Sequence, residues 1–385
     1  MTRNGIESMR DREEPMQSHL KLLHRWSHQM EAILVGVRVT RVRGLSLLVM
    51  GILLSRRVSL PAVAAAVPGR ARDESRIKRL QRWLANPAVK VEEMWPLIRR
   101  ALLHDVAGRK LILVFDPTPQ AGHTTVLVLG LLRHKRVLPL AWRLVPQQAD
   151  WDERMAPLLG AMAAEVAADL PVGCHITVLA DRGITGPATI RVLRALGWHI
   201  VFRLNVGPKQ TNRVQVAGDE WRLWDWITTH GWQWSGPVDL FKAAGWMRLE
   251  LTVVWDRRFA EPWILISDEP AGAARVRAYR RRTAIEATFA DTKRRGFDFE
   301  RTKIIDHDRL DRLLLGLAIA LWWATQLGLR VIRVGRRTAY DRSDRRDRSV
   351  LHLGTRELYE RLIYQRCPAL PFSKRNGVWR FALYS

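Results

Sequence analysis

The chain has 385 residues, of which 63 are Lys or Arg and 38 are Asp or Glu, so its formal net charge is +25. A hydrophobic content of 47% excludes disordered, collagen-like and coiled-coil proteins, and the length allows a large core with an insertion or several smaller units. The basic excess indicates a polyanionic partner, nucleic acid first, and two cysteines outside any Cys/His cluster indicate neither a disulfide framework nor a zinc site.

The N-terminal part of the chain predicts a polar segment followed by short helices. Residues 1–30 lack the apolar core of a signal peptide, so we expect a polar arm and no secretion. The apolar run 44–54 is too short to span a bilayer, which predicts no membrane anchor. We expect residues 31–105 to form a helical DNA-binding domain, with helices over 39–54, 60–67 and 73–85.

The third of these helices, residues 73–85, combines an apolar stripe with a group of arginines. Its stripe consists of Ile77, Leu80 and Leu84 at helical spacing, and elsewhere on its surface lie Arg72, Arg76, Arg79 and Arg82. This arrangement suits contact with DNA. The alternative is a solvated basic face that touches no groove, because charged helices are common.

From Lys110 onward the pattern changes to strands. Three successive antiparallel strands are predicted, then a helix, a buried strand ending at Asp181, a helix and a further strand, over 111–116, 124–132, 136–145, 152–170, 175–181, 187–196 and 198–204. The order β-β-β-α-β-α-β is that of a ribonuclease H-like core. We therefore predict an α/β fold and assign the first part of that core to residues 106–205.

Residues 206–270 read as a β-rich insertion that contains many tryptophans. Two alternating segments flank a predicted turn at 228–231 and carry Trp224, Trp226, Trp232 and Trp234. Cross-strand packing of these rings in a small sheet explains the pattern. The alternative is that one insertion Trp stacks on a base flipped out of a duplex. That role is equally open to Trp221, Trp246, Trp255 and Trp263.

Residues 271–332 are expected to complete the interrupted core. A helix is predicted from about Ala271 to about Arg295, where Gly296 offers a stop, and a second over about 310–331. Residues 333–385 form a basic C-terminal region, with a charged loop or flexible arm over 333–349 and a short helix near 355–364.

Two aspartates close apolar strands of the predicted core. Asp116 follows LILVF and Asp181 follows ITVLA, so each carboxylate should emerge at the C-terminal end of a strand. That edge is where open α/β sheets bind ligands. The alternative for either residue alone is an Asp that caps a loop.

The segment AYRRRTAIEATFADTKRRG carries the most specific pattern in the chain, at Tyr279, Arg282, Glu286 and Lys293. On an ideal helix of ~100° per residue these four lie within an arc of about 60°, so we expect one shared face. A class-level match to this pattern is expected by chance about 0.01 times in such a chain. The charge mix suits a helix that offers one metal ligand between phosphate contacts. The alternative is a solvated charged face.

With these motifs the chain resembles a DDE transposase of the IS4 family, which includes the Tn5-type enzymes, over about residues 111–296. In that family the YREK signature carries the catalytic Glu, and a β insertion precedes it. The resemblance implies a metal-binding catalytic triad of Asp116, Asp181 and Glu286. It also implies that the backbone of the element-end DNA is contacted by Tyr279, Arg282 and Lys293.

The resemblance implies two Mg²⁺ ions, with Mn²⁺ as a substitute, that activate a water or a 3′-hydroxyl for in-line displacement at phosphorus. It further implies cut-and-paste transposition, double-stranded DNA as element ends and target, a homodimer in the DNA complex, and a prokaryotic cytoplasm. Two rival hypotheses are a ribonuclease H-like nuclease without strand transfer and a non-catalytic DNA-binding relative or regulator. Tyr279 as a covalent recombinase nucleophile fits less well, because it lies one helical turn from Arg282 on the Glu286 face.

Overall fold

The chain divides into two compact units, each with its own core. The structure, a computed structural model, describes all residues except 1–2, 121–123, 148–150, 228–230, 258–259, 294–295 and 382–385, and describes no side chains for 3–16 or 151–153. What we call the helical unit comprises Met1–Asp105, Gln120–Gly122 and Phe289–Ser385. What we call the sheet unit comprises Val106–Pro119 and His123–Thr288.

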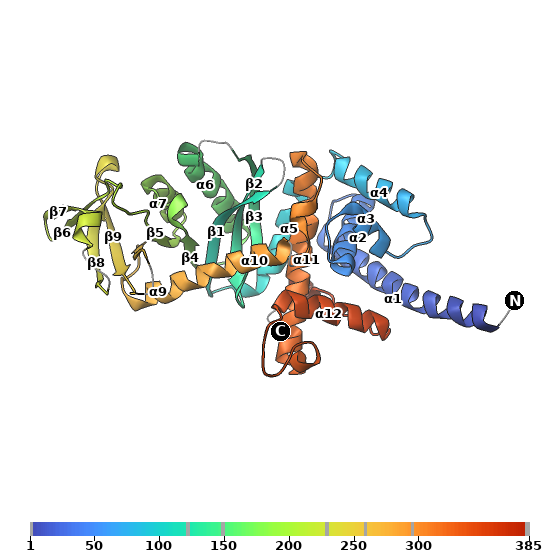
Figure 1. The fold of residues 1–385 in the computed structure, drawn as a ribbon. Helices are drawn as coiled ribbons and strands as arrows, with labels where there is room; N and C mark the ends of the chain where they lie inside the picture. The colour runs from blue at the N-terminus through green and yellow to red at the C-terminus, as the bar shows by residue number, and fades with distance from the viewer. Residues whose placement is uncertain are drawn as a thin grey trace. The chain divides into compact units, whose positions relative to one another are not determined.

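The described part of the sheet unit is built on one ten-stranded sheet with the order β3-β2-β1-β4-β5-β10-β9-β8-β6-β7. Its first half consists of β1 (Lys110–Gln120), β2 (Thr124–Arg133), β3 (Arg136–Pro146), β4 (His175–Ala180) and β5 (His199–Arg203). The connecting helices α6 (Trp151–Asp169) and α7 (Pro187–Arg194) pack against each other and against β3 and β5 (Figure 1). The predicted β-β-β-α-β-α-β order and α/β fold class are confirmed.

The register of the central strands brings the two predicted aspartates to one edge. Strands β1 and β4 are parallel, and their last paired residues are Phe115 and Ala180, so Asp116 and Asp181 leave the pairing side by side. The prediction that Asp116 ends its strand is wrong, because β1 continues to Gln120. Proline favours extended backbone and only lacks the N–H donor, so Pro117 does not end the strand.

The insertion is β-rich, as predicted. It contains β6 (Arg213–Val216), β7 (Asp219–Arg222), β8 (Gln233–Leu240), β9 (Met247–Val254) and β10 (Trp263–Ser267), and antiparallel pairing of β10 with β5 joins it to the core sheet. One segment differs, because Leu223–Trp226 forms a single helical turn, α8, instead of an alternating strand. Helical spacing lets Leu223 and Ile227 both face the core. The predicted turn at 228–231 lies largely outside the described residues.

The tryptophan rings of the insertion pack on one another. The Trp226 ring lies edge-on to Trp232, with ring centroids 5.1 Å apart, and to Trp234, at 4.8 Å. Trp224 lies 6.0 Å from Trp255. The packing explanation therefore accounts for these five rings, while Trp221 and Trp246 are exposed.

The predicted YREK helix is broken by a tighter turn. Helix α9 (Ala273–Arg280) is followed by a 3-10 turn, η4 (Arg281–Thr283), and then by α10 (Ala284–Thr292). Its end comes at Thr292, earlier than predicted, and Arg295 lies outside the described residues. Gly296 therefore does not end the helix, although a glycine is required at this position, since a Cβ there would come 1.6 Å from the carbonyl oxygen of Asp291.

The helical unit packs around one long apolar helix, α11 (His307–Arg333). The helices α2, α4, α5 and α12 contact it, and the unit comprises α1 (Arg3–Ile33), α2 (Val39–Ser55), α3 (Leu60–Ala66), α4 (Asp73–Ala85), α5 (Val91–Leu103), α12 (Val350–Ile363), and the hairpin β11 (Phe372–Arg375) with β12 (Val378–Phe381). By length and hydropathy α11 could cross a membrane, but 89% of its apolar window is buried inside the protein, as in a core helix.

Residues 1–30 depart from the predicted polar arm, whereas residues 333–349 largely form the predicted charged loop. Most of residues 1–30 forms α1 instead of a polar arm, because Leu22, Trp26 and Met30 recur every fourth residue and are fully buried. The segment 333–349 begins with a 3-10 turn, η6 (Arg336–Ala339), and Arg336 and Arg337 form ion pairs with Glu357 and Asp341. These pairs tie the charged segment to its own unit.

Candidate active site

The two aspartates are held by different local structures at the same sheet edge. Asp116 lies within β1 with a side chain only 16% exposed. Asp181 follows β4 and caps the 3-10 turn η2 (Arg182–Ile184), because its carboxylate accepts a hydrogen bond from the Arg182 N–H at 2.8 Å. This cap fixes the Asp181 side chain beside Asp116 of β1.

A buried guanidinium brings the three predicted carboxylates together. Arg282 lies in η4, and its side chain is 11% exposed. Its nitrogen atoms lie 3.2 Å from Asp116 Oδ2, 3.4 Å from Asp181 Oδ2 and 2.6 Å from Glu286 Oε1. Three carboxylates, one from strand β1, one from the cap of η2 and one from helix α10, therefore share a single cation. Glu286 is the most exposed of them, at 57%.

Tyr279 closes one side of this cluster. Its hydroxyl donates a hydrogen bond to Asp181 Oδ1 at 2.9 Å, and its ring is almost fully buried. The Trp263 ring packs edge-on against it, with centroids 5.2 Å apart, and the Arg282 guanidinium lies 6.0 Å from the Tyr279 ring centroid. The contacts lock the tyrosine, so its hydroxyl is a fixed donor to the aspartate.

The surroundings shift the pKa values of the two aspartates in opposite directions. Burial raises the pKa of Asp116 to about 6, against the opposing charge of Arg282 and with support from the Asp181 and Glu286 charges. Burial would also raise the pKa of Asp181, but the Arg182 N–H, Arg282 and the Tyr279 hydroxyl outweigh it and lower that pKa below its usual value. Both carboxylates are mainly ionised at neutral pH, although Asp116 holds its charge at a cost.

The remaining two groups keep their protons. Burial and the neighbouring Asp181 charge raise the pKa of the Tyr279 hydroxyl, so the group stays a hydrogen-bond donor. Burial acts to lower the pKa of Arg282, but the surrounding carboxylates raise it overall, and the guanidinium remains charged.

A second layer of charge around Asp181 was not predicted from the sequence. Arg182 and Arg203 both pair with Glu261, at 2.6 and 3.3 Å, and the positive charge of Arg203 helps to lower the pKa of Asp181. Arg182 could have been noticed because it directly follows Asp181. Nothing local marks Glu261, which comes from the loop before β10.

The donor types of this cluster suit a hard divalent cation, since Mg²⁺ prefers carboxylate oxygens. Within the described residues, however, no three His, Cys, Asp or Glu side chains are arranged to hold a metal ion. The physical reason is visible in the distances, because the Arg282 guanidinium occupies the space among the carboxylates. The residues fit a metal by type, and here an arginine supplies the positive charge.

Lys293 is the predicted site residue that the structure does not join to this cluster. It follows the end of α10, lies in the helical unit and forms an ion pair with Glu300 at 3.2 Å. The 3-10 turn at 281–283 also departs from the ideal helix on which the shared face was predicted. The contact of Lys293 with DNA stays a prediction.

Comparison with known proteins gives three findings. A family model described as the transposase DDE domain matches residues 135–323, a segment that begins after Asp116 and includes the other five predicted site residues. This match supports a DDE transposase. No curated protein sequence matches the chain significantly. A structure of piggyBac transposase in a synaptic complex with hairpin DNA is similar at 11% sequence identity and a TM-score of 0.43, covering 91% of this chain and 80% of that one.

Proposed function

We propose that the chain is a DDE transposase that excises a mobile element from double-stranded DNA and inserts it elsewhere by hydrolysis and strand transfer. One observation carries the proposal: Asp116, Asp181 and Glu286 converge on a single buried cation at the ligand-binding edge of the sheet. The transposase DDE match over residues 135–323 supports the same reading. The proposal includes assignment to the IS4 type, which depends on the YREK signature.

Within this proposal the three carboxylates would hold divalent metal ions, two Mg²⁺ with Mn²⁺ as a substitute. When bound, the ions would activate the attacking water or 3′-hydroxyl and stabilise the leaving oxygen. Asp116 and Asp181 are ionised at neutral pH and ready to act as ligands. In this structure Arg282 pairs with these carboxylates. It would turn to a DNA phosphate when the metal ions bind, because a guanidinium binds phosphates and carboxylates alike in bidentate geometry.

The partner would be double-stranded DNA, both as element ends and as target. The net charge of +25 supports this, because affinity for a polyanion rises with the number of cations that meet it. Tyr279, Arg282 and Lys293 would contact the backbone of the element end, and residues 31–105 would serve as the DNA-binding domain. A homodimer would pair two ends, and by its IS4 resemblance the enzyme would work in a prokaryotic cytoplasm.

The test is a plasmid assay with the purified protein, Mg²⁺ and the inverted repeats that flank the coding region. We expect Asp116→Asn, Asp181→Asn and Glu286→Gln each to abolish cleavage while duplex binding remains, because binding depends mainly on basic residues. The matched control is Glu165→Gln, which removes an exposed carboxylate paired with Arg143 in the same unit and should cut normally.

The same assay separates the two rivals. Precut ends that join a target plasmid support the transposase, whereas cleavage without joining supports a ribonuclease H-like nuclease. Binding without cleavage by the unmodified chain supports a regulator. Normal cleavage by Asp181→Asn would refute the assignment of the site.

A further inference from the structure

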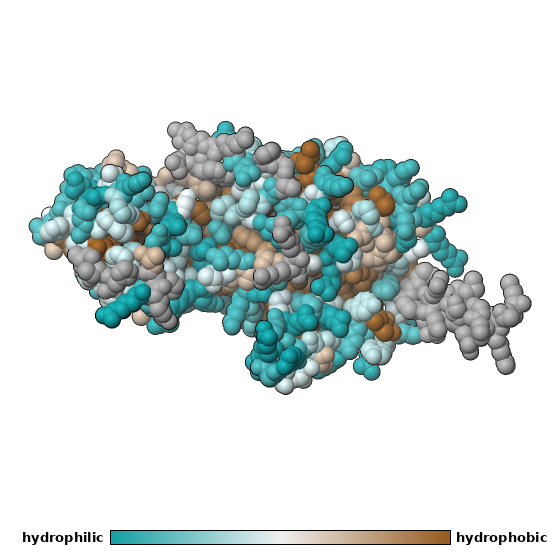
Figure 2. Space-filling model, viewed as in Figure 1, coloured by the Kyte–Doolittle hydropathy of each residue, from teal (hydrophilic) through white to brown (hydrophobic). Residues whose placement is uncertain are grey.

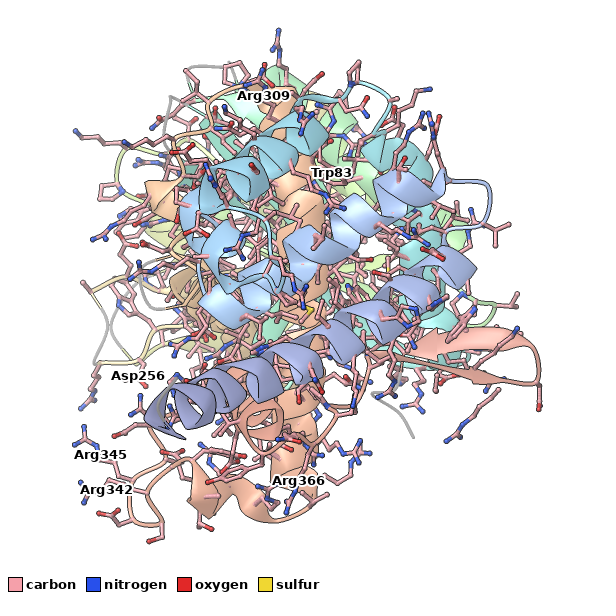
Figure 3. The ribbon with its side chains drawn as sticks, turned by 90° about the vertical axis from the view of Figure 1, so that its right-hand side faces the viewer. Trp83, Asp256, Arg309, Arg342, Arg345 and Arg366 are labelled. Atoms are coloured by element: carbon pink, nitrogen blue, oxygen red, sulfur yellow. The ribbon has the colours of Figure 1, made fainter. Side chains whose placement is uncertain are left out.

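A basic groove lies in the helical unit, between the first turns of α2 and the last two turns of α4. It encloses about 460 Å³. Its rim carries four arginines, two from each helix: Arg41, Arg43, Arg79 and Arg82. Figure 3 places Trp83 between the ribbons of these two helices. Trp83 lines the groove and is almost fully buried, so we take it as the groove floor. We call this feature the α2–α4 groove.

The floor of the groove is rigid and fixes the spacing of its two arginine pairs. Gly44 lets the helices approach, because a Cβ at that position would come 2.0 Å from Trp83 Cδ1. The indole Nε1 donates a hydrogen bond to the Arg41 carbonyl oxygen at 2.8 Å. Trp83 is only 8% exposed, so its ring packs between the helices and leaves little free face on which a base could stack.

The charge of the groove is unbalanced. No Asp or Glu is among the described residues that line it. Arg43 has an outside partner in Glu31, at 2.9 Å, but Arg41 and Arg79 have no side-chain hydrogen bond or ion pair within the part of the chain that the structure describes. Guanidinium groups gathered without a counter-charge raise the local positive potential and attract an anion. The surface over α4 is largely hydrophilic (Figure 2).

The groove also corrects the arginine set expected from the sequence. Arg76 turns away from it, because its guanidinium donates to the Val67 carbonyl oxygen at 2.6 Å and pairs with Asp73. Only Arg79 and Arg82 of the predicted group line the groove, and α2 supplies the other two arginines. The site therefore depends on helix packing that no single-helix pattern contains.

We propose that the α2–α4 groove binds the phosphate backbone of duplex DNA, an inference that rests on the proposed function. Arginine forks match phosphate oxygens bidentately, and the positive end of the α2 helix dipole lies beside Thr40, which lines the groove. A duplex fits better than a single strand, because single-strand sites need exposed aromatic faces and Trp83 is buried.

The test measures binding of the full chain to a short fluorescein-labelled DNA duplex by anisotropy over a range of salt concentrations. The Arg41→Gln/Arg79→Gln variant should lower the slope of log affinity against log salt by about 1.8, or ~0.9 for each lost phosphate contact. The matched control is Arg342→Gln/Arg345→Gln, which removes the same charge from exposed arginines of the same unit that pair with Asp344 and Asp347. Figure 3 shows these two well away from Trp83.

A second variant separates binding from folding. Thr40→Glu places a carboxylate in the first turn of α2, where an acid favours the helix, so its melting temperature should hold or rise while duplex affinity falls. Equal slope losses in the groove and control variants, or none in the groove variant, overturn the proposal. So does an effect confined to single-stranded DNA or to duplex RNA. Cleavage by the Asp181→Asn variant tests the proposed function independently, since the groove takes no part in that outcome.

Discussion

Replacing Arg282 by Gln should destabilise the metal-free protein at neutral pH and raise its affinity for Mn²⁺ in the absence of DNA. Arg282 is the one cation in contact with all three site carboxylates within the described residues. Glutamine keeps hydrogen-bonding capacity and removes the charge. The carboxylates then repel one another until a proton or a metal ion replaces the guanidinium.

The magnitude follows from the pKa of Asp116. At a folded-state pKa of about 6, its ionised carboxyl costs the folded state roughly 3 kcal/mol at pH 7 relative to an ordinary Asp. Without Arg282 the pKa rises further, but proton uptake limits the total penalty to roughly 4.4 kcal/mol at pH 7. The loss through Asp116 is therefore at most about 1.4 kcal/mol, and the more exposed pairs with Asp181 and Glu286 add roughly 1 kcal/mol.

The loss should depend on pH in a definite direction. Because the folded pKa of Asp116 lies above its unfolded value, the folded state binds more protons between about pH 4 and 6, and stability falls as pH rises through that window. The variant extends the window upward. At pH 5 Asp116 is mostly protonated in both proteins, so its share of the difference shrinks to about 0.1 kcal/mol.

Urea unfolding in EDTA at pH 5 and pH 7 measures the stability, and titration with Mn²⁺ followed by electron paramagnetic resonance measures the metal affinity. We expect about tenfold tighter Mn²⁺ binding, the equivalent of ~1.4 kcal/mol. Arg143→Gln, at an exposed pair with Glu165, is the control and should change stability by less than about 0.5 kcal/mol. An equal loss at both pH values, or unchanged Mn²⁺ affinity, would refute the reasoning.

Three further outcomes can be checked on the same protein. Lys293→Ala should lower the salt slope of element-end binding by about 0.9, and Tyr279→Phe by much less; an unchanged slope for Lys293→Ala excludes a backbone contact there. Burial and nearby arginines lower the pKa of His352 to about 4, so His352 is neutral in the fold and stability falls as pH drops from about 6.5 to 4. His352→Gln should remove roughly 1–2 kcal/mol of that fall, after allowance for its partial exposure, in urea midpoints measured across the range. Trp226→Ala should cost about 1–3 kcal/mol of stability and leave duplex affinity intact; lost affinity with intact stability would instead favour base stacking.

The order of the core elements could be predicted because the signals are local. Apolar runs of strand length mark β2 and β3, and the continuous apolar run of β4 marks a strand buried on both faces. The adjacency of Asp116 and Asp181 could also be anticipated, since each directly follows an apolar run in the sequence. Their register, with Phe115 opposite Ala180, could not, because it depends on which strand β1 pairs with.

Other features depend on contacts between distant segments. Residues 1–30 look polar in composition, yet the stripe of Leu22, Trp26 and Met30 buries itself in the unit that contains Trp323, whose ring lies 4.7 Å from Trp26. The average polarity of the segment does not reveal that one face of the helix is apolar. The turn α8 was not predicted because it has only four residues, which are too few to show a helical period.

Arg282 shows the limit most clearly. Its spacing of four residues from Glu286 is local and predicts an ion pair along the helix. Its contacts with Asp116 and Asp181 require the sheet order that places β1 beside β4, and the 3-10 turn that aims the side chain at them. An arginine in a sequence pattern predicts that an anion binds there, but the pattern does not identify the anion. The carboxylates and the DNA phosphate then compete for the same guanidinium, and the Mn²⁺ titration of Arg282→Gln measures the carboxylate side of that competition directly.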